Sequence, residues 1–126
     1  MIQVHIATSM WRVELVHGWI TRDGRMLRGC CDFDRQWIGV SDRLEPDKRQ
    51  QTCWHELAHA IREELDVEPD RDLSDEAYAR LTAMGLMHIS PVDLDRMRCY
   101  MATGIEAHDV ISIRGVGIVP VIGFVG

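Results

Sequence analysis

The sequence lacks an excess of basic residues and lacks a long apolar run. Its 126 residues include 14 Lys and Arg against 20 Asp and Glu, which gives a formal net charge of −6. Binding to a phosphate backbone requires a basic face, so no nucleic-acid partner is expected. The longest apolar run, Val116 to Val125, is well short of the ~20 residues that span a bilayer, so no membrane partner is expected either.

Cysteine spacing and the first residues exclude two further classes of protein. The four cysteines form no C-x-x-C pair, and the adjacent Cys30 and Cys31 would point to opposite faces of a strand, which favours packing over a disulfide. Residues Met1 to His5 contain no basic run followed by an apolar core, so no signal peptide is expected. Both features predict a reduced, cytoplasmic protein.

The composition is ordinary for a globular protein, with 46% hydrophobic and 27% charged residues. A chain of this length can bury roughly two-thirds of the surface that its unfolded form exposes, and it can fold without disulfides or other staples. We therefore expect residues 1–126 to form a single domain.

Alternation of apolar and polar residues predicts three or four short strands before any helix. The expected strands are residues 2–8, 11–16, 28–34 and 36–41. Gly18 and the Asp23-Gly24 pair mark turns. The last two strands are separated by almost nothing, which predicts a hairpin that turns near Asp34-Arg35.

Capping residues predict three helices after the strands. The first extends from Pro46 to about Leu65, since proline is tolerated in the first turn of a helix. The second follows Ser74 as its N-cap and covers residues 75–88, and the third lies between Pro91 and Gly104. The sequence thus predicts an α+β fold, in which a small antiparallel or mixed sheet packs on the first helix and two further helices follow.

The first helix carries the motif H-E-x-x-H, formed by His55, Glu56 and His59. Residues four apart lie on one side of a helix, so both imidazoles can reach one metal ion, while Glu56 can deprotonate a water molecule beside it. On a helical wheel the two histidines lie ~110–150° from the centre of the apolar stripe. We therefore expect them at a cleft rather than in the core, as ligands of Zn²⁺.

A catalytic zinc usually takes three protein ligands and leaves a fourth position for water. The candidates for the third ligand are Asp72, Asp75, Glu76, His88, Cys99, Glu106 and His108. We favour Glu76, because it lies on the second helix at the edge of the apolar stripe and is expected to face the first helix. Asp75, one position earlier, points ~100° away.

The two helices together resemble a known family. His55-Glu56-Leu57-Ala58-His59, a short linker and then Glu76-Ala77-Tyr78-Ala79-Arg80 are similar to the ImmA/IrrE-type zinc peptidases and their small phage-encoded relatives. The resemblance covers roughly residues 28–88. It implies a zincin-like (gluzincin-like) metallopeptidase domain with its core at about residues 28–104, and it implies that Glu76 completes the metal site.

These assignments predict a zinc-dependent peptidase that acts on a protein or peptide substrate, with Glu56 as general base. Tyr78, His88, Tyr100 and His108 are candidate donors to the oxyanion, and none of them stands out. An extended substrate is expected to pair with an exposed strand edge, for which residues 36–41 are the candidate. The alternative is a regulatory or interaction module of the same fold that binds zinc and hardly turns over.

The apolar tail, residues 110–126, has three interpretations. It forms a terminal hairpin that completes the sheet, or it is a disordered end, or it is a contact surface for another copy of the chain or a larger assembly, since an exposed apolar segment tends to associate.

Overall fold

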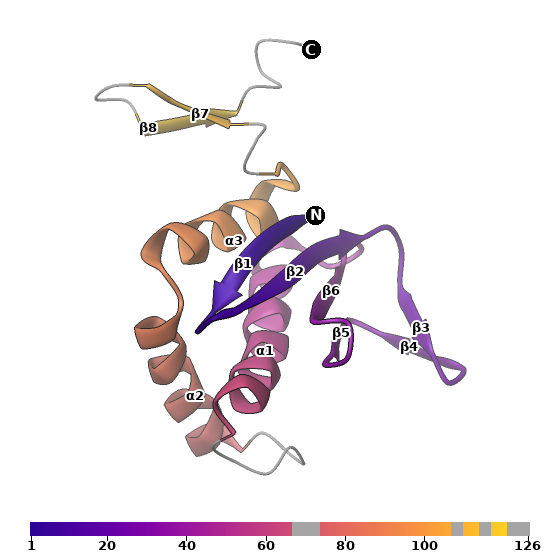
Figure 1. Cartoon of the computed structure of the whole chain (residues 1–126). Helices are drawn as coiled ribbons and strands as arrows, with labels where there is room; N and C mark the ends of the chain where they lie inside the picture. The colour runs from indigo at the N-terminus through magenta and orange to yellow at the C-terminus, as the bar shows by residue number, and fades with distance from the viewer. Residues whose placement is uncertain (67–73, 107–109, 114–116, 121–126) are drawn as a thin grey trace.

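The computed structural model describes residues 1–66, 74–106, 110–113 and 117–120, and its fold is α+β (Figure 1). A run of short strands precedes three helices, and two more short strands end the described chain. In order, the elements are β1 (Ile2–Ile6), β2 (Ser9–Val16), β3 (Ile20–Arg22), β4 (Arg25–Leu27), β5 (Gly29–Asp32), β6 (Trp37–Ser41), α1 (Pro46–Leu65), α2 (Asp75–His88), α3 (Pro91–Thr103), β7 (Val110–Ile113) and β8 (Gly117–Pro120).

Four of the strands form one mixed sheet in the order β1-β2-β6-β5. β1 and β2 are antiparallel, β2 and β6 are parallel, and β5 and β6 form the hairpin predicted from the sequence. β3 and β4 pair only with each other and project from the body of the molecule as a separate hairpin (Figure 1). In the four-stranded sheet, β1 and β5 are therefore the two edge strands.

The outer edge of β1 is covered by side chains of α3. The Asp93 carboxylate accepts a hydrogen bond from the backbone N–H of His5 at 3.0 Å, and the Arg96 guanidinium donates to the carbonyl of Gln3 at 2.9 Å. Backbone groups of an uncovered edge strand can pair with another chain, and these contacts occupy them. Strand addition at β1 is thereby blocked.

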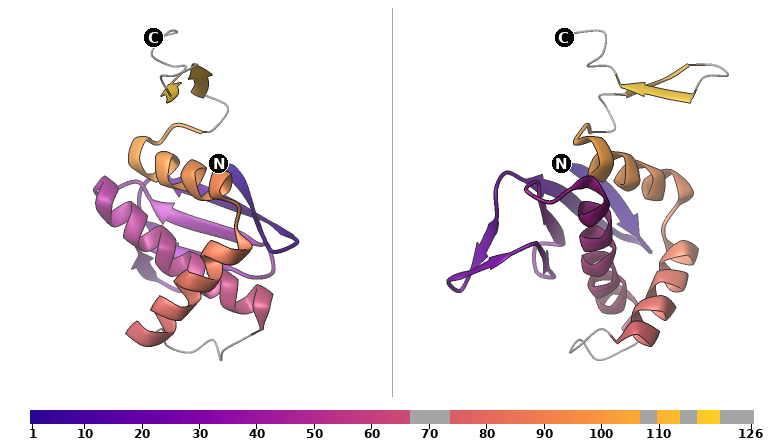
Figure 2. Two further views of the ribbon diagram at one scale, coloured as in Figure 1. Left: turned by 90° about the vertical axis from the view of Figure 1, so that its left-hand side faces the viewer. Right: turned by 180° about the vertical axis from the view of Figure 1, so that it is seen from behind.

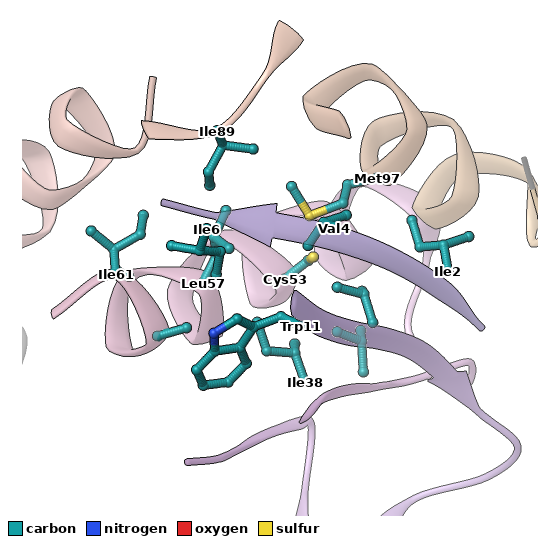
Figure 3. Packing of buried hydrophobic residues seen from close by; sticks show 14 of the residues in the cluster. Ile2, Val4, Ile6, Trp11, Ile38, Cys53, Leu57, Ile61, Ile89 and Met97 are labelled. Atoms are coloured by element: carbon teal, nitrogen blue, oxygen red, sulfur yellow. The ribbon is translucent and has the colours of Figure 1, made fainter. Parts of the chain in front are cut away.

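α1 packs against β5 and β6, α3 packs against β1, and α2 packs on α1 (Figure 2). A single cluster of buried side chains fills the space between them, drawn from the first strands as well as from the helices (Figure 3). Ile2, Val4 and Trp11 are at most 3% exposed. The core thus begins at Ile2, and the expectation that it starts near residue 28 is too narrow.

The helix boundaries confirm the capping residues identified in the sequence. The Ser74 hydroxyl accepts from the N–H of Ala77 at 3.2 Å, and the Ser90 hydroxyl accepts from the N–H of Asp93 at 3.1 Å. α3 ends at Gly104 in the left-handed conformation, with φ of 73°.

Glu64, on the last turn of α1, links the helix to the strands. Its carboxylate accepts hydrogen bonds from Ser9 Oγ at 2.7 Å, from the indole of Trp11 at 2.8 Å and from Gln36 Nε2 at 3.2 Å. The Trp11 side chain is completely buried, so its N–H has no access to water in place of this carboxylate.

A second polar contact closes the turn between β2 and β3. The Asp42 carboxylate accepts from the backbone N–H of Gly18 at 2.9 Å and lies 3.1 Å from His17 Nδ1. The Gly18 hydrogen bond, and then His17, hold the pKa of Asp42 below its usual value.

β7 and β8 pair with each other as a two-stranded antiparallel sheet. They do not join the four-stranded sheet, so the expectation that the tail completes that sheet is wrong. The adjoining residues 107–109, 114–116 and 121–126 lie outside the described part of the chain.

Candidate functional site

α1 carries the two motif histidines on the side of the helix that faces away from the core. The ring centroids of His55 and His59 are 5.1 Å apart, with their planes at 73°. His55 is exposed and His59 is half-buried, whereas Leu57 and Ala58 between them are 1% exposed. The prediction that the histidines lie off the buried stripe is confirmed.

Glu56 lines two adjoining cavities beside this pair. One cavity, of about 440 Å³, is also lined by His59 and by β5 from Gly29 onward. The other, of about 510 Å³, is also lined by His55, Gly29 and Thr52. The two cavities share Gly29 and Glu56, so together they form a groove that follows β5 along α1, with the Glu56 carboxylate in its middle.

The groove follows the uncovered edge of the sheet. β6 lies between β2 and β5, so the expectation that residues 36–41 offer an exposed edge is wrong, because both sides of that strand are paired. The N–H of Ser41 donates to the carbonyl of Arg28 at 2.8 Å. Bonded and non-bonded pairs alternate along an antiparallel ladder, so Gly29 and Cys31 direct their backbone groups away from β6.

Gly29 brings this edge close to α1. A Cβ atom at Gly29 would lie 2.5 Å from Cγ2 of Thr52 and 3.1 Å from Cγ of Glu56. Real Cβ atoms do not approach other carbons to 2.5 Å, so a side chain at position 29 would force Thr52, β5 or α1 to shift. Gly29 was not among the residues predicted for the site, although a glycine in a strand is a known signal for close backbone approach.

Tyr78 of α2 contacts His55 of the motif. Its ring stacks on His55 with a centroid distance of 6.2 Å and an interplanar angle of 26°. Burial, with a smaller contribution from Cys53, raises the pKa of Tyr78. Among the described oxyanion-donor candidates, Tyr78, His88 and Tyr100, Tyr78 is the one that stacks on a motif histidine, and His108 lies outside the described residues.

Although His55 is exposed, partial desolvation of its ring lowers its pKa, and the nearby His59 and Arg62 lower it further. Arg62 itself is 2% exposed, which the helical pattern did not predict. A His55 ring held neutral has a lone pair available for a metal ion.

Glu76 does not lie beside the histidines. Its side chain is 88% exposed and lies 3.9 Å from Arg80, one turn along α2. The expectation that it faces α1 is wrong, and the reason is the rotation of α2 about its own axis. The centre of the buried stripe on α2 is ~140° from Glu76 on a helical wheel.

The inward stripe of α2 is formed by Ala77, Tyr78, Leu81 and Gly85. A Cβ atom at Gly85 would lie 2.6 Å from Cδ1 of Ile61, so α2 lies close to α1 at this glycine. Ala83 and Met87, on the same helix, are exposed.

The other candidates for a third metal ligand are spread over the chain. His88 is exposed, Cys99 is half-buried on α3, and Glu106 forms an ion pair with the N-terminal amine. Asp72, His108 and the side chain of Asp75 lie outside the described residues. Within residues 1–66 and 74–106, no three His, Cys, Asp or Glu side chains gather in a way that could hold a metal ion.

None of the described helices has the length and apolar character needed to cross a membrane. None of the four cysteines forms a disulfide.

Comparison of the chain with protein-family models gives no match, and comparisons with curated proteins and with solved structures give none either. The resemblance to the ImmA/IrrE-type peptidases therefore stays a prediction, carried by the motif on α1 and the first turns of α2.

Proposed function

We propose that this protein is a zinc-dependent peptidase that hydrolyses a protein or peptide substrate in the groove between β5 and α1. One observation carries the proposal: His55 and His59 lie one helical turn apart on the outer side of α1, and Glu56 lines the groove at the only uncovered edge of the described four-stranded sheet. The motif, a cleft and a strand edge for an extended substrate thus coincide.

The described residues fit a zinc ion in part. The two imidazoles are suitable donors on one side of the helix, but the third ligand has to come from elsewhere. We keep Glu76 as the proposed third ligand. Its exposed ion pair with Arg80 contributes at most about 1 kcal/mol and does not hold the carboxylate in place. Bringing the carboxylate to the histidines would also require α2 to rearrange, because its buried residues Ala77 and Leu81 face the core.

The residues of the site have separate roles in the proposed reaction. A bound zinc ion would supply Lewis-acid polarisation of the attacking water and of the peptide carbonyl. Glu56 would accept the proton of that water and then donate it to the leaving amine. The edge strand β5 would hold an extended substrate by backbone hydrogen bonds, with Gly29 keeping the strand close to Glu56.

The test is zinc content and peptide cleavage of the full chain, purified without a metal-affinity tag. We expect about one zinc ion per chain in the parent, as is usual for such sites. His59→Ala should abolish zinc binding, whereas His88→Ala, which removes an exposed histidine from α2, should leave it unchanged. Glu56→Gln should keep the zinc and lose cleavage. A parent protein that binds no zinc would refute the proposal.

The Glu76 assignment has its own comparison. Glu76→Ala should weaken zinc binding far more than Asp75→Ala, because adjacent helical positions point ~100° apart. Equal effects of the two substitutions would place the third ligand elsewhere.

A second candidate is a zinc-binding regulatory module that hardly turns over. The exposed position of Glu76 favours it, because two protein ligands bind and activate a metal less effectively than three. Zinc retained by the parent together with no cleavage of any peptide in a random library would support this alternative. A reduced, cytoplasmic location and an assembly contact through residues 110–126 are proposed with either function.

A further inference from the structure

The β3–β4 hairpin forms the outer wall of the groove. Arg22 and Leu27 line the cavity beside His59, and Leu27 also lines the cavity beside His55 together with Met26. Met26 is 65% exposed although it borders the groove. The hairpin thus contributes side chains to both halves of the groove, on the side opposite α1.

Arg22 is the cationic side chain that lines the same cavity as Glu56 and His59. Its Nη1 donates to the sulfur of Cys30 at 3.4 Å. In the described part of the chain this thiol is its only hydrogen-bond acceptor. A thiol sulfur is a weak acceptor, and a guanidinium carries five N–H donors in a planar fork that fits a carboxylate. Arg22 is an exposed side chain that lines the cavity, so most of its donor capacity faces solvent and is available to a ligand there.

The neighbouring carboxylates do not take up this capacity. Asp23 and Asp32 are near enough to favour the charged form of Arg22, yet neither accepts a hydrogen bond from it. Asp32 instead accepts from the backbone N–H of Arg35 at 3.1 Å. Its carboxylate also lies 3.9 Å from the Arg35 guanidinium.

We propose that Arg22 binds a carboxylate of the substrate in the half of the groove next to His59. The inference rests on the proposed function, since it assumes that a peptide occupies the groove. The proposed substrates are peptides with a carboxylate on one side of the cleaved bond. This carboxylate belongs either to an acidic side chain or to the C-terminus of the peptide. Both sources present the same planar pair of oxygens to the guanidinium fork.

The hairpin provides a matched control. Arg25 is the cross-strand partner of Arg22 in the β3–β4 register, it is exposed, and it lines neither cavity. Arg22→Gln and Arg25→Gln therefore remove the same charge from the same hairpin, and only the first removes it from the groove. Long-range electrostatic effects on peptide binding should be similar in the two variants.

The experiment measures binding rather than turnover. The full chain with Glu56→Gln is immobilised and exposed to a mixture of random octapeptides, half with a free C-terminus and half amidated, and the retained peptides are sequenced by mass spectrometry. If Arg22 binds an acidic side chain, the retained peptides should be enriched in Asp and Glu at one position. If it binds the C-terminus, peptides with a free C-terminus should be retained in preference to amidated ones. The enrichment should persist with Arg25→Gln and disappear with Arg22→Gln.

The best retained peptide then gives a Kd by fluorescence anisotropy. Arg22→Gln should raise that Kd roughly tenfold, as expected for the loss of a charge-assisted pair of hydrogen bonds, and Arg25→Gln should change it less than twofold. Peptides retained without carboxylate enrichment, or weakened equally by both substitutions, would overturn the Arg22 proposal and leave the peptidase proposal standing. If no peptide is retained by any variant, the Arg22 proposal falls, while the peptidase proposal is decided separately by the zinc content and cleavage of the parent.

Discussion

Replacing Gly29 with alanine tests how closely the edge strand must approach the metal-binding helix. Gly29 is not among the residues with positive φ, so its backbone conformation is open to alanine. The obstacle is the space: the added methyl group would lie 2.5 Å from Cγ2 of Thr52, 3.1 Å from Cγ of Glu56 and 3.2 Å from the carbonyl oxygen of Gly39. The strand and the helix must move apart to accept it.

The expected cost follows from these contacts. Overpacking by one methyl group costs about 1–3 kcal/mol, and the reduced freedom of the unfolded chain returns about 0.4–1 kcal/mol. The net loss for Gly29→Ala should be about 1–2 kcal/mol. Thr52→Ala removes the atom in closest contact and should cost under about 1 kcal/mol alone, since alanine is the better helix former. In the double variant most of the loss should be recovered.

The assay is a double-mutant cycle in urea, with the free energy of unfolding measured for all four proteins. We expect a favourable coupling of at least about 1 kcal/mol between positions 29 and 52, equivalent to roughly 3–6 °C in Tm for a chain of this size. Peptide cleavage should fall in Gly29→Ala more than its stability explains, because Glu56 is displaced. Parental stability for Gly29→Ala, or no rescue by Thr52→Ala, would refute the close-packing argument.

Three further expectations concern groups outside the groove. Glu64→Ala should lower the free energy of unfolding in urea by about 2–4 kcal/mol, because the buried indole N–H of Trp11 loses its acceptor. The control Glu63→Ala, at an exposed position, should change it by no more than about 0.5 kcal/mol. Equal losses in the two variants would contradict this prediction. The pKa of Asp42 is lower in the folded protein than its unfolded value of 3.8, so its charged form stabilises the fold above pH 3.8, and this stabilisation is lost as the pH falls through the folded pKa. Asp42→Asn should therefore flatten the decline of the free energy of unfolding between pH 5 and pH 3. Burial raises the pKa of Cys53 to about 12, so N-ethylmaleimide at pH 8 should label this thiol only after urea is added, and rapid labelling of the native protein would contradict its burial.

Much of the fold could be predicted from local sequence signals. Ser74, Ser90, Pro91 and Gly104 set helix ends through contacts with residues at most four positions away, and such signals are legible in one sequence. The hairpin of β5 and β6 is local for the same reason. The strand order was not predictable, because the parallel pairing of β2 with β6 joins segments that are separated by the β3–β4 hairpin and by β5.

The same distinction between local and long-range contacts applies to the candidate site. His55, Glu56 and His59 lie within one turn and a half of α1, so their common side could be derived from helical geometry alone. The orientation of Glu76 depends on how α2 rotates against α1, where Ala77 and Leu81 are buried and Gly85 lies close to Ile61. No periodicity within α2 reveals a contact with another helix.

The covered edge of β1 has a consequence for the order of events during folding. The contacts that cover it join His5 to Asp93 and Gln3 to Arg96, at separations of 88 and 93 residues. During synthesis β1 leaves the ribosome long before α3 exists, so its backbone groups stay exposed while most of the chain is made. The hairpin of β1 and β2 can form early, but the outer edge of β1 is covered only when α3 docks. A chain stalled before residue 93 would therefore expose the edges of both β1 and β5, whereas the folded chain exposes only that of β5 in its described four-stranded sheet.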